Sequence, residues 1–241
     1  MSFTELLVHG SVQELSAAAG EGIAEGLRRA LAGGAATLAL AGGSTPAGAY
    51  RHIARHYAGL AWEDVAVFWG DERYVAHDSS QSNYRMARET LLDRVPIPAV
   101  RVHPMPTDAP DPDDAAGAYE ELLWREFGEL PRFDVLVLGL GQDGHIASLF
   151  PGADALQESL RWVLATEAPS DPRRRLTLTL PVINNARSVH FIVSGARKHG
   201  ALTRALADRA PSPDCPASLV RPREGTLTWW VDEAALCGRG D

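Results

Sequence analysis

The sequence of 241 residues lacks any run of about 18 consecutive apolar residues, and its start lacks the basic-then-apolar layout of a secretory signal. It also has only two cysteines, Cys215 and Cys237, and no CxxC pair. These absences argue against a membrane span, export, a disulfide framework and a zinc ribbon. We therefore expect a cytoplasmic protein.

Positive charge is scarce as well, because 23 Lys and Arg stand against 31 Asp and Glu and no block of basic residues occurs. The formal net charge of −8 repels nucleic acids and anionic membranes, so we expect neither as a partner. An anionic ligand would need a local cluster of cations. The proportions of hydrophobic residues (45%) and charged residues (22%) are typical of a globular protein. We expect a single α/β domain over residues 1–241, as a monomer or a weak homo-oligomer.

Six apolar segments have the length and composition of β-strands, and turn residues or a helical pattern follow most of them. They are residues 36–41, 65–69, 133–138, 176–180, 189–193 and 226–231. This alternation predicts a three-layer α/β fold, in which a mostly parallel, doubly wound, Rossmann-like sheet carries helices on both faces. Segment 176–180 alternates between apolar and polar residues, so we expect a half-exposed edge strand there.

Helix signals lie between these strands. Ser44 or Thr45 is the expected N-cap of a helix that continues to Tyr57, with Pro46 at or near its first position. A helix is also expected after residues 139–145, and Pro151 would end it early. Residues 104–114 mix turn formers with charge, which predicts a surface loop. Before residue 36 we expect only a short helical stretch.

In open α/β sheets, ligands bind beyond the carboxyl ends of the strands. The first such place in this sequence is the turn after segment 36–41, which consists of Gly42, Gly43, Ser44 and Thr45. Its backbone N–H groups, hydroxyls and following helix N-terminus suit a phosphate or a carboxylate. A tight turn that binds nothing would explain the same residues equally well.

Residues 139–144 match the pattern G-x-G-x-x-G after a strand, which is typical of dinucleotide-binding loops. The match lies far into the chain, and Pro151 soon interrupts the helix that should follow. The position that should hold a ribose falls near Trp162 and Val163, which are not acidic. We therefore reject a nucleotide site. Asp143 and His145 instead supply acid–base groups that a phosphate cradle does not need.

Two hydrolase classes are disfavoured in the same way. His52 and His56 stand four residues apart but lack the glutamate of H-E-x-x-H, which argues against a zinc protease. The turn at residues 42–46 resembles a nucleophile elbow, but Pro46 stands where G-x-S-x-G requires glycine. We expect neither a metal site nor a nucleophilic serine.

Five segments taken in order resemble one family of sugar-phosphate enzymes. Three of them are residues 41–46, residues 69–75 with 82–84 after them, and residues 139–152; residues 175–181 and 194–198 follow. Together they are similar to the 6-phosphogluconolactonases of the glucosamine/galactosamine-6-phosphate isomerase superfamily. The resemblance spans nearly the whole chain.

The resemblance implies hydrolysis of 6-phospho-D-glucono-1,5-lactone, in the oxidative pentose phosphate pathway, without a metal or an organic cofactor. His145 would activate the water, since a histidine can accept a proton near neutral pH. Asp143 would orient the imidazole or stabilise its protonated form. Arg73 or loop N–H groups would stabilise the negative charge of the tetrahedral intermediate.

By the same resemblance, the phosphate would lie on the turn at residues 42–45, with Arg175 and Lys198 closing around it. Guanidinium favours bidentate phosphate contacts, and ammonium supplies a compact charge. Asp71 and Glu72 are further candidates for contact with the substrate. A solvated loop would explain these two carboxylates as well, and a surface position on an edge strand would explain Arg175.

Two alternatives remain. Glucosamine-6-phosphate deaminase has a similar Gly-x-Asp-Gly-His-Ile-Ala segment, which Ile146 fits, but its pattern continues with Phe-Asn-Glu-Pro. This chain has residues 148–151, Ser-Leu-Phe-Pro, and so lacks the glutamate expected for ring opening. Arg73 also stands where the deaminase usually has Tyr. A non-catalytic sugar-phosphate sensor is the other alternative, although little room for a DNA-binding module precedes residue 36.

Overall fold

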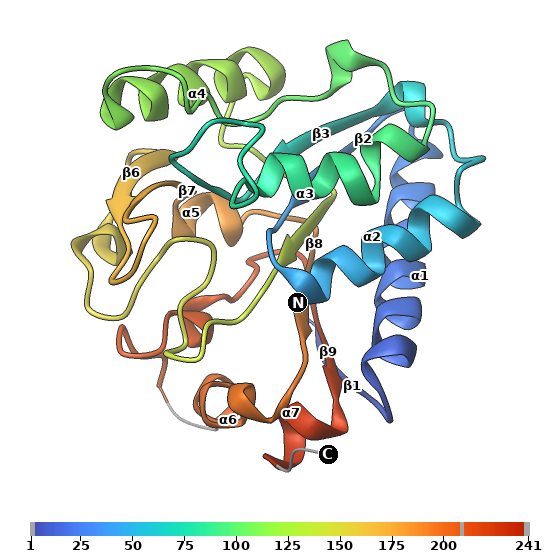
Figure 1. Ribbon diagram of the computed structural model, residues 1–241, viewed down its shortest axis with the longest axis vertical. Coiled ribbons are helices and arrows are strands. Elements are labelled where there is room, and N and C mark those ends of the chain that lie inside the picture. The colour runs from blue at the N-terminus through green and yellow to red at the C-terminus, as the bar shows by residue number, and fades with distance from the viewer. Residues whose placement is uncertain (1–2, 208–209, 239–241) are drawn as a thin grey trace.

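The computed structural model describes residues 3–207 and 210–238, and two β-sheets organise these residues (Figure 1). The larger sheet has the strand order β1-β9-β8-β5-β2-β3, and all its neighbouring strands are parallel. Its strands are β1 (Phe3–His9), β2 (Ala36–Leu40), β3 (Val65–Trp69), β5 (Val135–Leu138), β8 (Ser188–Val193) and β9 (Thr226–Asp232). The smaller, antiparallel sheet contains β4 (Asp71–Arg73), β7 (Arg174–Leu178) and β6 (Val163–Glu167), in that order.

Helices lie on both sides of the larger sheet, which confirms the predicted three-layer α/β architecture (Figure 1). On one side α1 packs against β9, β8 and β5, and α2 packs against α1. The smaller sheet lies on the other side, and α4 packs against its strands β6 and β7. The helices are α1 (Val12–Leu31), α2 (Ser44–His56), α3 (Asn83–Thr90), α4 (Pro112–Phe127), α5 (Leu180–Ile183), α6 (His199–Leu206) and α7 (Glu233–Cys237).

The direction of winding reverses between β2 and β5, which are neighbours in the sheet. After β2 the chain continues to β3 on one side, whereas after β5 it continues, by way of the smaller sheet, to β8 and β9 on the other. Asp134, just before β5, accepts hydrogen bonds from the backbone N–H and the hydroxyl of Thr37 in β2, at 2.9 and 2.8 Å. A reversal of this kind leaves a crevice at the carboxyl ends of the two strands, where ligands bind.

Five of the six predicted strands are confirmed as members of the larger sheet: β2, β3, β5, β8 and β9. Every residue of β3 and of β5 is buried. β5 is a central strand of the sheet, whereas β3 is an outer strand whose edge is covered where the N–H of His103 donates to the carbonyl of Val67. Their continuous apolar runs predicted this burial.

The prediction of an edge strand at residues 176–180 was wrong. β7 is the middle strand of the smaller sheet, between β4 and β6. Thr177 and Thr179 are buried, and the hydroxyl of Thr177 accepts a hydrogen bond from the backbone N–H of Ser148. The polar residues of this alternating segment therefore have hydrogen-bond partners inside the protein. From the sequence pattern alone, such residues cannot be distinguished from residues that face solvent.

Three local predictions were also wrong. α2 starts at Ser44 with Gly43 as its N-cap, so neither Ser44 nor Thr45 caps it. No helix follows residues 139–145, which form turns up to Pro151. Residues 112–114 belong to α4 instead of a loop: Asp111 caps the helix by accepting from the N–H of Asp113, at 2.9 Å.

The predictions missed β1, α4, β4 and β6, and the helical stretch before residue 36 is the 20-residue helix α1. Its start had a sequence signal, since Ser11 accepts from the N–H of Glu14 while Glu14 accepts from the N–H of Gly10. No helix within residues 3–207 and 210–238 is long and apolar enough to span a membrane. The single domain over 1–241 stays a prediction; residues 1–2, 208–209 and 239–241 lie outside the described residues.

Candidate active site

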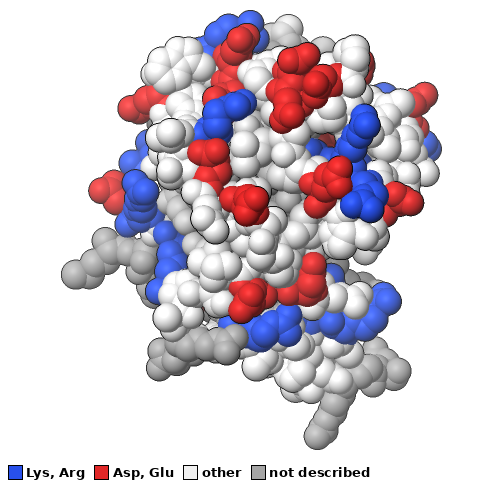
Figure 2. Space-filling view, turned by 90° about the vertical axis from the view of Figure 1, so that its left-hand side faces the viewer, with Lys and Arg blue, Asp and Glu red and all other residues white. Residues whose placement is uncertain are grey.

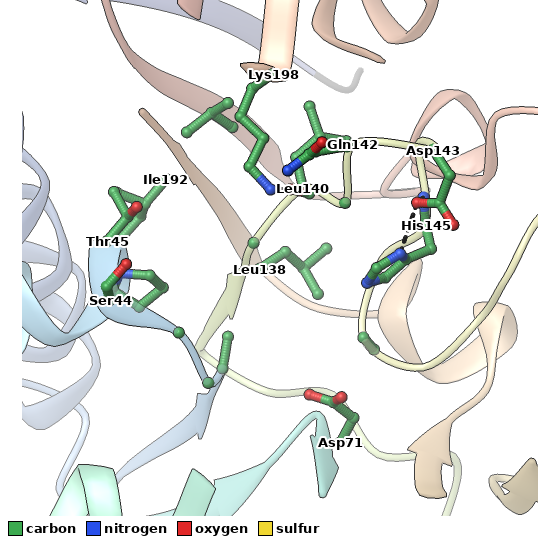
Figure 3. A pocket seen from close by; sticks show the side chains of 18 of the residues that line it. Ser44, Thr45, Asp71, Leu138, Leu140, Gln142, Asp143, His145, Ile192 and Lys198 are labelled. Carbon is green, nitrogen blue, oxygen red and sulfur yellow. Dashed lines mark hydrogen bonds and ion pairs between the residues drawn. The ribbon is translucent and has the colours of Figure 1, made fainter. Parts of the chain in front are cut away.

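A cavity of about 710 Å³ opens at the carboxyl ends of β2, β5 and β8, at the reversal between β2 and β5. The loops that follow these three strands line it, together with β4 and β7. It brings together all but one of the residues that the sequence nominated: Gly42, Gly43, Ser44, Thr45, Asp71, Arg73, Asp143, His145, Arg175 and Lys198. In Figure 3, Ser44 and Thr45 lie on one side of the cavity and His145 lies on the other.

The turn after β2 presents an open helix N-terminus to the cavity. Gly43 has a φ of 104°, a left-handed conformation that favours glycine, and makes no side-chain cap to α2. The first N–H groups of α2 therefore keep donors for a ligand. A Cβ on Gly42 would collide with the amide of Asn83, so glycine is required there by packing.

His145 is oriented by Asp143. The Nδ1 of His145 lies 2.6 Å from Oδ1 of Asp143, and the backbone N–H of His145 donates to the same oxygen at 3.1 Å. An ionised carboxylate only accepts, so Nδ1 of a neutral ring carries the proton and Nε2 keeps a free lone pair. Partial burial raises the pKa of Asp143, but its hydrogen bonds and attraction to His145 outweigh this and lower the pKa to about 2. Figure 3 shows the second ring nitrogen on the cavity side.

One glycine makes room for this pair, and a second is required in the same turn for another reason. A Cβ on Gly141 would overlap both the ring of His145 and the carboxylate of Asp143. Gly144 has a φ of 98° and lies against Cys215, whose Sγ would be 2.9 Å from a Cβ at that position. Glycine is therefore required at two positions of the G-x-G-x-x-G pattern, at Gly141 by the histidine–aspartate pair and at Gly144 by Cys215 and the positive φ.

Asp71 lies in the lower part of the cavity in Figure 3 and is held in place from two sides. Its Oδ2 accepts from the hydroxyl of Ser148 at 2.7 Å, and its Oδ1 accepts from the amide of Asn83 at 3.3 Å. The same amide donates to the backbone carbonyl of Asp71 at 2.9 Å. Sequence reasoning assigned no role to Asn83 or Ser148, although both belong to the recognised motifs.

Both interpretations of Glu72 were wrong, since it neither lines the cavity nor lies in a solvated loop. It is 1% exposed, and its carboxylate accepts from the N–H groups of Asn83 and Tyr84, both at 2.8 Å. It also accepts from the N–H of Arg73 and from the hydroxyl of Ser82. Glu72 therefore holds the N-terminus of α3. In a short strand, successive side chains point to opposite faces, so Asp71 and Glu72 cannot both face the cavity.

Arg73 and Arg175 face each other across β4 and β7, and both line the cavity. Like charges in this position destabilise a sheet unless something compensates them. Arg73 donates to the carbonyl of Gln81 and Arg175 to that of Pro172, both at 2.7 Å. The Nε of Arg73 is buried without a hydrogen-bond partner in the described part of the chain. This wall of the cavity thus suits a negatively charged group.

Lys198 supplies the positive charge at the end of β8. It is the only lysine in the sequence, among 23 basic residues. Its Nζ donates to the carbonyl of Leu140 at 2.6 Å, which links the β8 loop to the β5 loop. Burial and the neighbouring Arg197 lower the pKa of Lys198, whereas Asp143 opposes that shift. Figure 3 shows the ammonium between the Ser44 side and the His145 side.

Asp232, at the end of β9, supports this loop and was missed by sequence reasoning. Its carboxylate accepts from the hydroxyl of Ser194 and from the N–H of Gly195, and it also caps α7. Gly195 has a φ of 94°, close to the 104° of Gly43 in the turn after β2. The position of Asp232, a charged residue at the carboxyl end of the last strand, was the feature of the sequence that could have identified it.

Within the described ranges, no group of three or more His, Cys, Asp or Glu side chains is placed to hold a metal ion. The charged groups of the cavity instead have the distribution needed for an anionic organic ligand, with cations at two walls and one histidine–aspartate pair. Independence from metals and cofactors stays a prediction.

Comparison with known proteins identifies the family. The family model described as glucosamine-6-phosphate isomerases/6-phosphogluconolactonase matches residues 10–229. The chain belongs to this family. A 6-phosphogluconolactonase of Synechocystis sp. is 48% identical over 206 residues, which are 84% of each chain. Another, of Mycobacterium tuberculosis, is 40% identical over 230 residues, 92% of each chain.

Solved structures agree on the architecture. The 6-phosphogluconolactonase of Trypanosoma cruzi superposes with a TM-score of 0.88 at 33% identity, covering 98% of this chain and 97% of that one. A monomeric glucosamine-6-phosphate deaminase superposes with a TM-score of 0.82 at 23% identity, so it shares the fold. Because members with different activities share this fold, the side chains of the site must discriminate between the activities.

Proposed function

We propose that this protein hydrolyses 6-phospho-D-glucono-1,5-lactone to 6-phospho-D-gluconate, with His145 as the general base. The observation that carries the proposal is the pairing of His145 Nδ1 with Asp143, which leaves Nε2 free on the cavity side. Relatives at 48% and 40% identity carry the name of this activity. The expected place of the reaction is the oxidative pentose phosphate pathway of the cytoplasm.

The reaction would begin with a water molecule between Nε2 of His145 and the lactone carbonyl carbon. His145 takes a proton from the water as its oxygen attacks, and Asp143, ionised at neutral pH, stabilises the imidazolium that forms. The carbonyl oxygen becomes negatively charged in the tetrahedral intermediate. The ring C–O bond then breaks, and the leaving oxygen regains its proton from the same imidazolium.

Negative charge on the intermediate would be stabilised by Arg73 and by loop N–H groups, as preorganised donors do at such sites. Arg73 is suited to this role because its Nε is buried and has no partner in the described protein. The phosphate would lie at the other side, on the turn at residues 42–45 beside Lys198. The resemblance implies that Arg175 closes around the phosphate together with Lys198. Because Arg175 stands opposite Arg73, we propose instead that it attracts the anionic substrate toward the wall that contains Arg73.

One contact argues for the lactonase over the deaminase. Phe150 stands where the deaminase pattern has its glutamate, and its ring packs against the ring of His145 at 4.7 Å between centroids. An apolar ring cannot give a proton to a sugar ring oxygen, whereas it can shield the histidine from bulk water. Ile146, which fits the deaminase pattern, is buried and lines no part of the cavity.

The sensor alternative has little support in the described residues. Binding alone needs no general base, yet the Nδ1 of His145 is paired with the carboxylate of Asp143 at 2.6 Å. We therefore propose a catalytic role without a nucleic acid or membrane partner.

The test is an assay with freshly generated 6-phosphogluconolactone and, in parallel, with glucosamine 6-phosphate. We expect acid release from the lactone well above the spontaneous rate, and no ammonia from the amino sugar. Lactone hydrolysis no faster than the spontaneous rate would refute the proposal, and ammonia release would favour the deaminase.

A further inference from the structure

An apolar patch on α4 lies apart from the active site. We call it the α4 patch: Gly117, Glu121, Trp124 and Arg125 of α4, with Leu160 and Trp162 beside them. Trp124 is 57% exposed and Leu160 is 85% exposed. The rings of Trp124 and Trp162 lie 5.3 Å apart, so they form one continuous apolar surface. None of these residues lines the catalytic cavity.

Leu160 is exposed yet held in a fixed position. One carboxylate oxygen of Glu158 accepts from the backbone N–H groups of Ser159, Leu160 and Arg161, at 2.8, 2.7 and 3.0 Å. These hydrogen bonds lower the pKa of Glu158. The turn is therefore ordered by its own side chain, and Leu160 protrudes from it as a preorganised apolar knob.

Glu120 fixes this turn to α4. Its carboxylate accepts from the N–H groups of Trp162 and Val163, at 2.7 and 3.0 Å, and from Nε of Arg161 at 3.1 Å. The knob and the helix surface beside it thus form one rigid unit. A rigid surface loses little conformational entropy when it binds, which favours recognition.

Gly117 is not explained by the fold. It lies inside α4, where glycine costs about 0.5–1 kcal/mol relative to alanine. Its φ is not positive, and a Cβ added to it would meet nothing within 4 Å. The missing side chain therefore serves no contact within the described chain. Gly117 and Trp124 line one shallow hollow, and Leu160 lies at its edge.

Charges around the patch complement one another. Glu121 and Arg125 are exposed one helical turn apart on α4, so the patch carries both signs although the whole chain carries a net charge of −8. Figure 2, which views the side of the molecule that carries the smaller sheet, shows acidic and basic side chains interspersed there. A second copy of the chain would meet less repulsion here than its net charge implies.

We propose that the α4 patch is the interface of a weak symmetric homodimer. A two-fold contact pairs a surface with itself, so a knob and a hollow on one patch satisfy each other twice. Leu160 of each copy enters the hollow at Gly117 and Trp124 of the other. The two α4 helices run antiparallel, and Glu121 of each copy meets Arg125 of the other.

The experiment is sedimentation velocity of the full chain over a series of protein concentrations. We expect the mass to rise with concentration toward twice that of the chain. Leu160→Ser should weaken this association at least about tenfold, equivalent to about 1.4 kcal/mol. A protein that stays monomeric throughout, or a dimer that Leu160→Ser leaves intact, would overturn the proposal.

Gly117→Gln is a second variant, in which weaker association could not be explained by loss of folding. Glutamine favours a helix more than glycine does, so this variant should melt at a higher temperature while it associates more weakly. The matched control is Val100→Ser, because Val100 is 79% exposed but lies outside the patch. It should dimerise as the unchanged chain does. A Gly117→Gln protein that gains thermal stability and still dimerises normally would also contradict the proposal.

Discussion

The loop after β5 and the loop after β8 are built alike but anchored differently. Each contains a glycine with positive φ, Gly144 at 98° and Gly195 at 94°, and each presents one functional side chain to the cavity. The β5 loop orients His145 through its own Asp143. The β8 loop is held from another strand, by Asp232. A general base needs a defined tautomer, which a local partner sets, whereas a bound phosphate needs only a charge in the right place.

If the β5 loop carries the chemistry, His145→Ala should have the largest effect. We expect kcat to fall about 10²–10⁴-fold with little change in KM, because removal of a general base affects the chemical step. Steady-state kinetics with the fresh phosphorylated lactone measures this. His56→Ala, at an exposed histidine of α2, is the control and should behave as the unchanged enzyme. Near-normal turnover by His145→Ala would show that the β5 loop does not supply the general base.

If the β8 loop binds the phosphate, Lys198→Ala should act on KM. We expect KM for the phosphorylated lactone to rise about ten- to hundredfold, since a hydrogen bond to a charged group contributes about 1.5–3 kcal/mol. KM for unphosphorylated gluconolactone should hardly change. Measuring both substrates with the same preparation provides the internal control. An equal rise for both would show that Lys198 does not act through the phosphate.

Gly141→Ala tests the local anchoring of His145 without removing any functional group. The added methyl overlaps the histidine ring and the Asp143 carboxylate, so the ring must move. We expect kcat to fall about tenfold, because small misplacements of reacting groups are costly. Gly59→Ala is the control, since a Cβ there meets nothing within 4 Å. Unchanged turnover would mean that the pair tolerates displacement.

The last prediction concerns the stability of the protein and not its turnover, and it depends on β8, the strand that precedes the loop of Lys198. Its buried His190 accepts from the indole N–H of Trp230 at 3.0 Å, and burial lowers its pKa to about 4. An unfolded chain therefore takes up this proton first, near the ordinary histidine pKa of about 6.5. The free energy of unfolding should be unaffected above that pH and fall by about 1.4 kcal/mol per pH unit as the pH drops from there toward 4.

Chemical denaturation across this pH range measures the slope, and His190→Gln should reduce it. The substitution will lower stability at neutral pH, so the slope and not the absolute value is compared. An identical slope in both proteins would assign the acid sensitivity to other groups.

Much of the fold was predictable because buried strands have a distinct composition. The run at residues 65–69 predicted β3 correctly, and the glycine-rich turns after β2 and β5 predicted the edge of the sheet at which the cavity opens. The pattern failed at β7, since Thr177 and Thr179 look like solvent-facing residues until their partners are known. The sequence analysis failed at Glu72 for a similar reason. From the sequence, a glutamate that accepts hydrogen bonds from a helix N-terminus cannot be told apart from a glutamate that contacts a ligand.

The sequence by itself determined the class of the sheet, the turns at the strand ends and the candidate pair Asp143 and His145. These depend on local composition and on spacing along the chain. Only the tertiary structure decided which ring nitrogen is free, that Arg73 faces Arg175, and that Asp232 supports the loop of Lys198. Each of these facts depends on contacts between segments far apart in the chain, which hydrophobic periodicity does not encode.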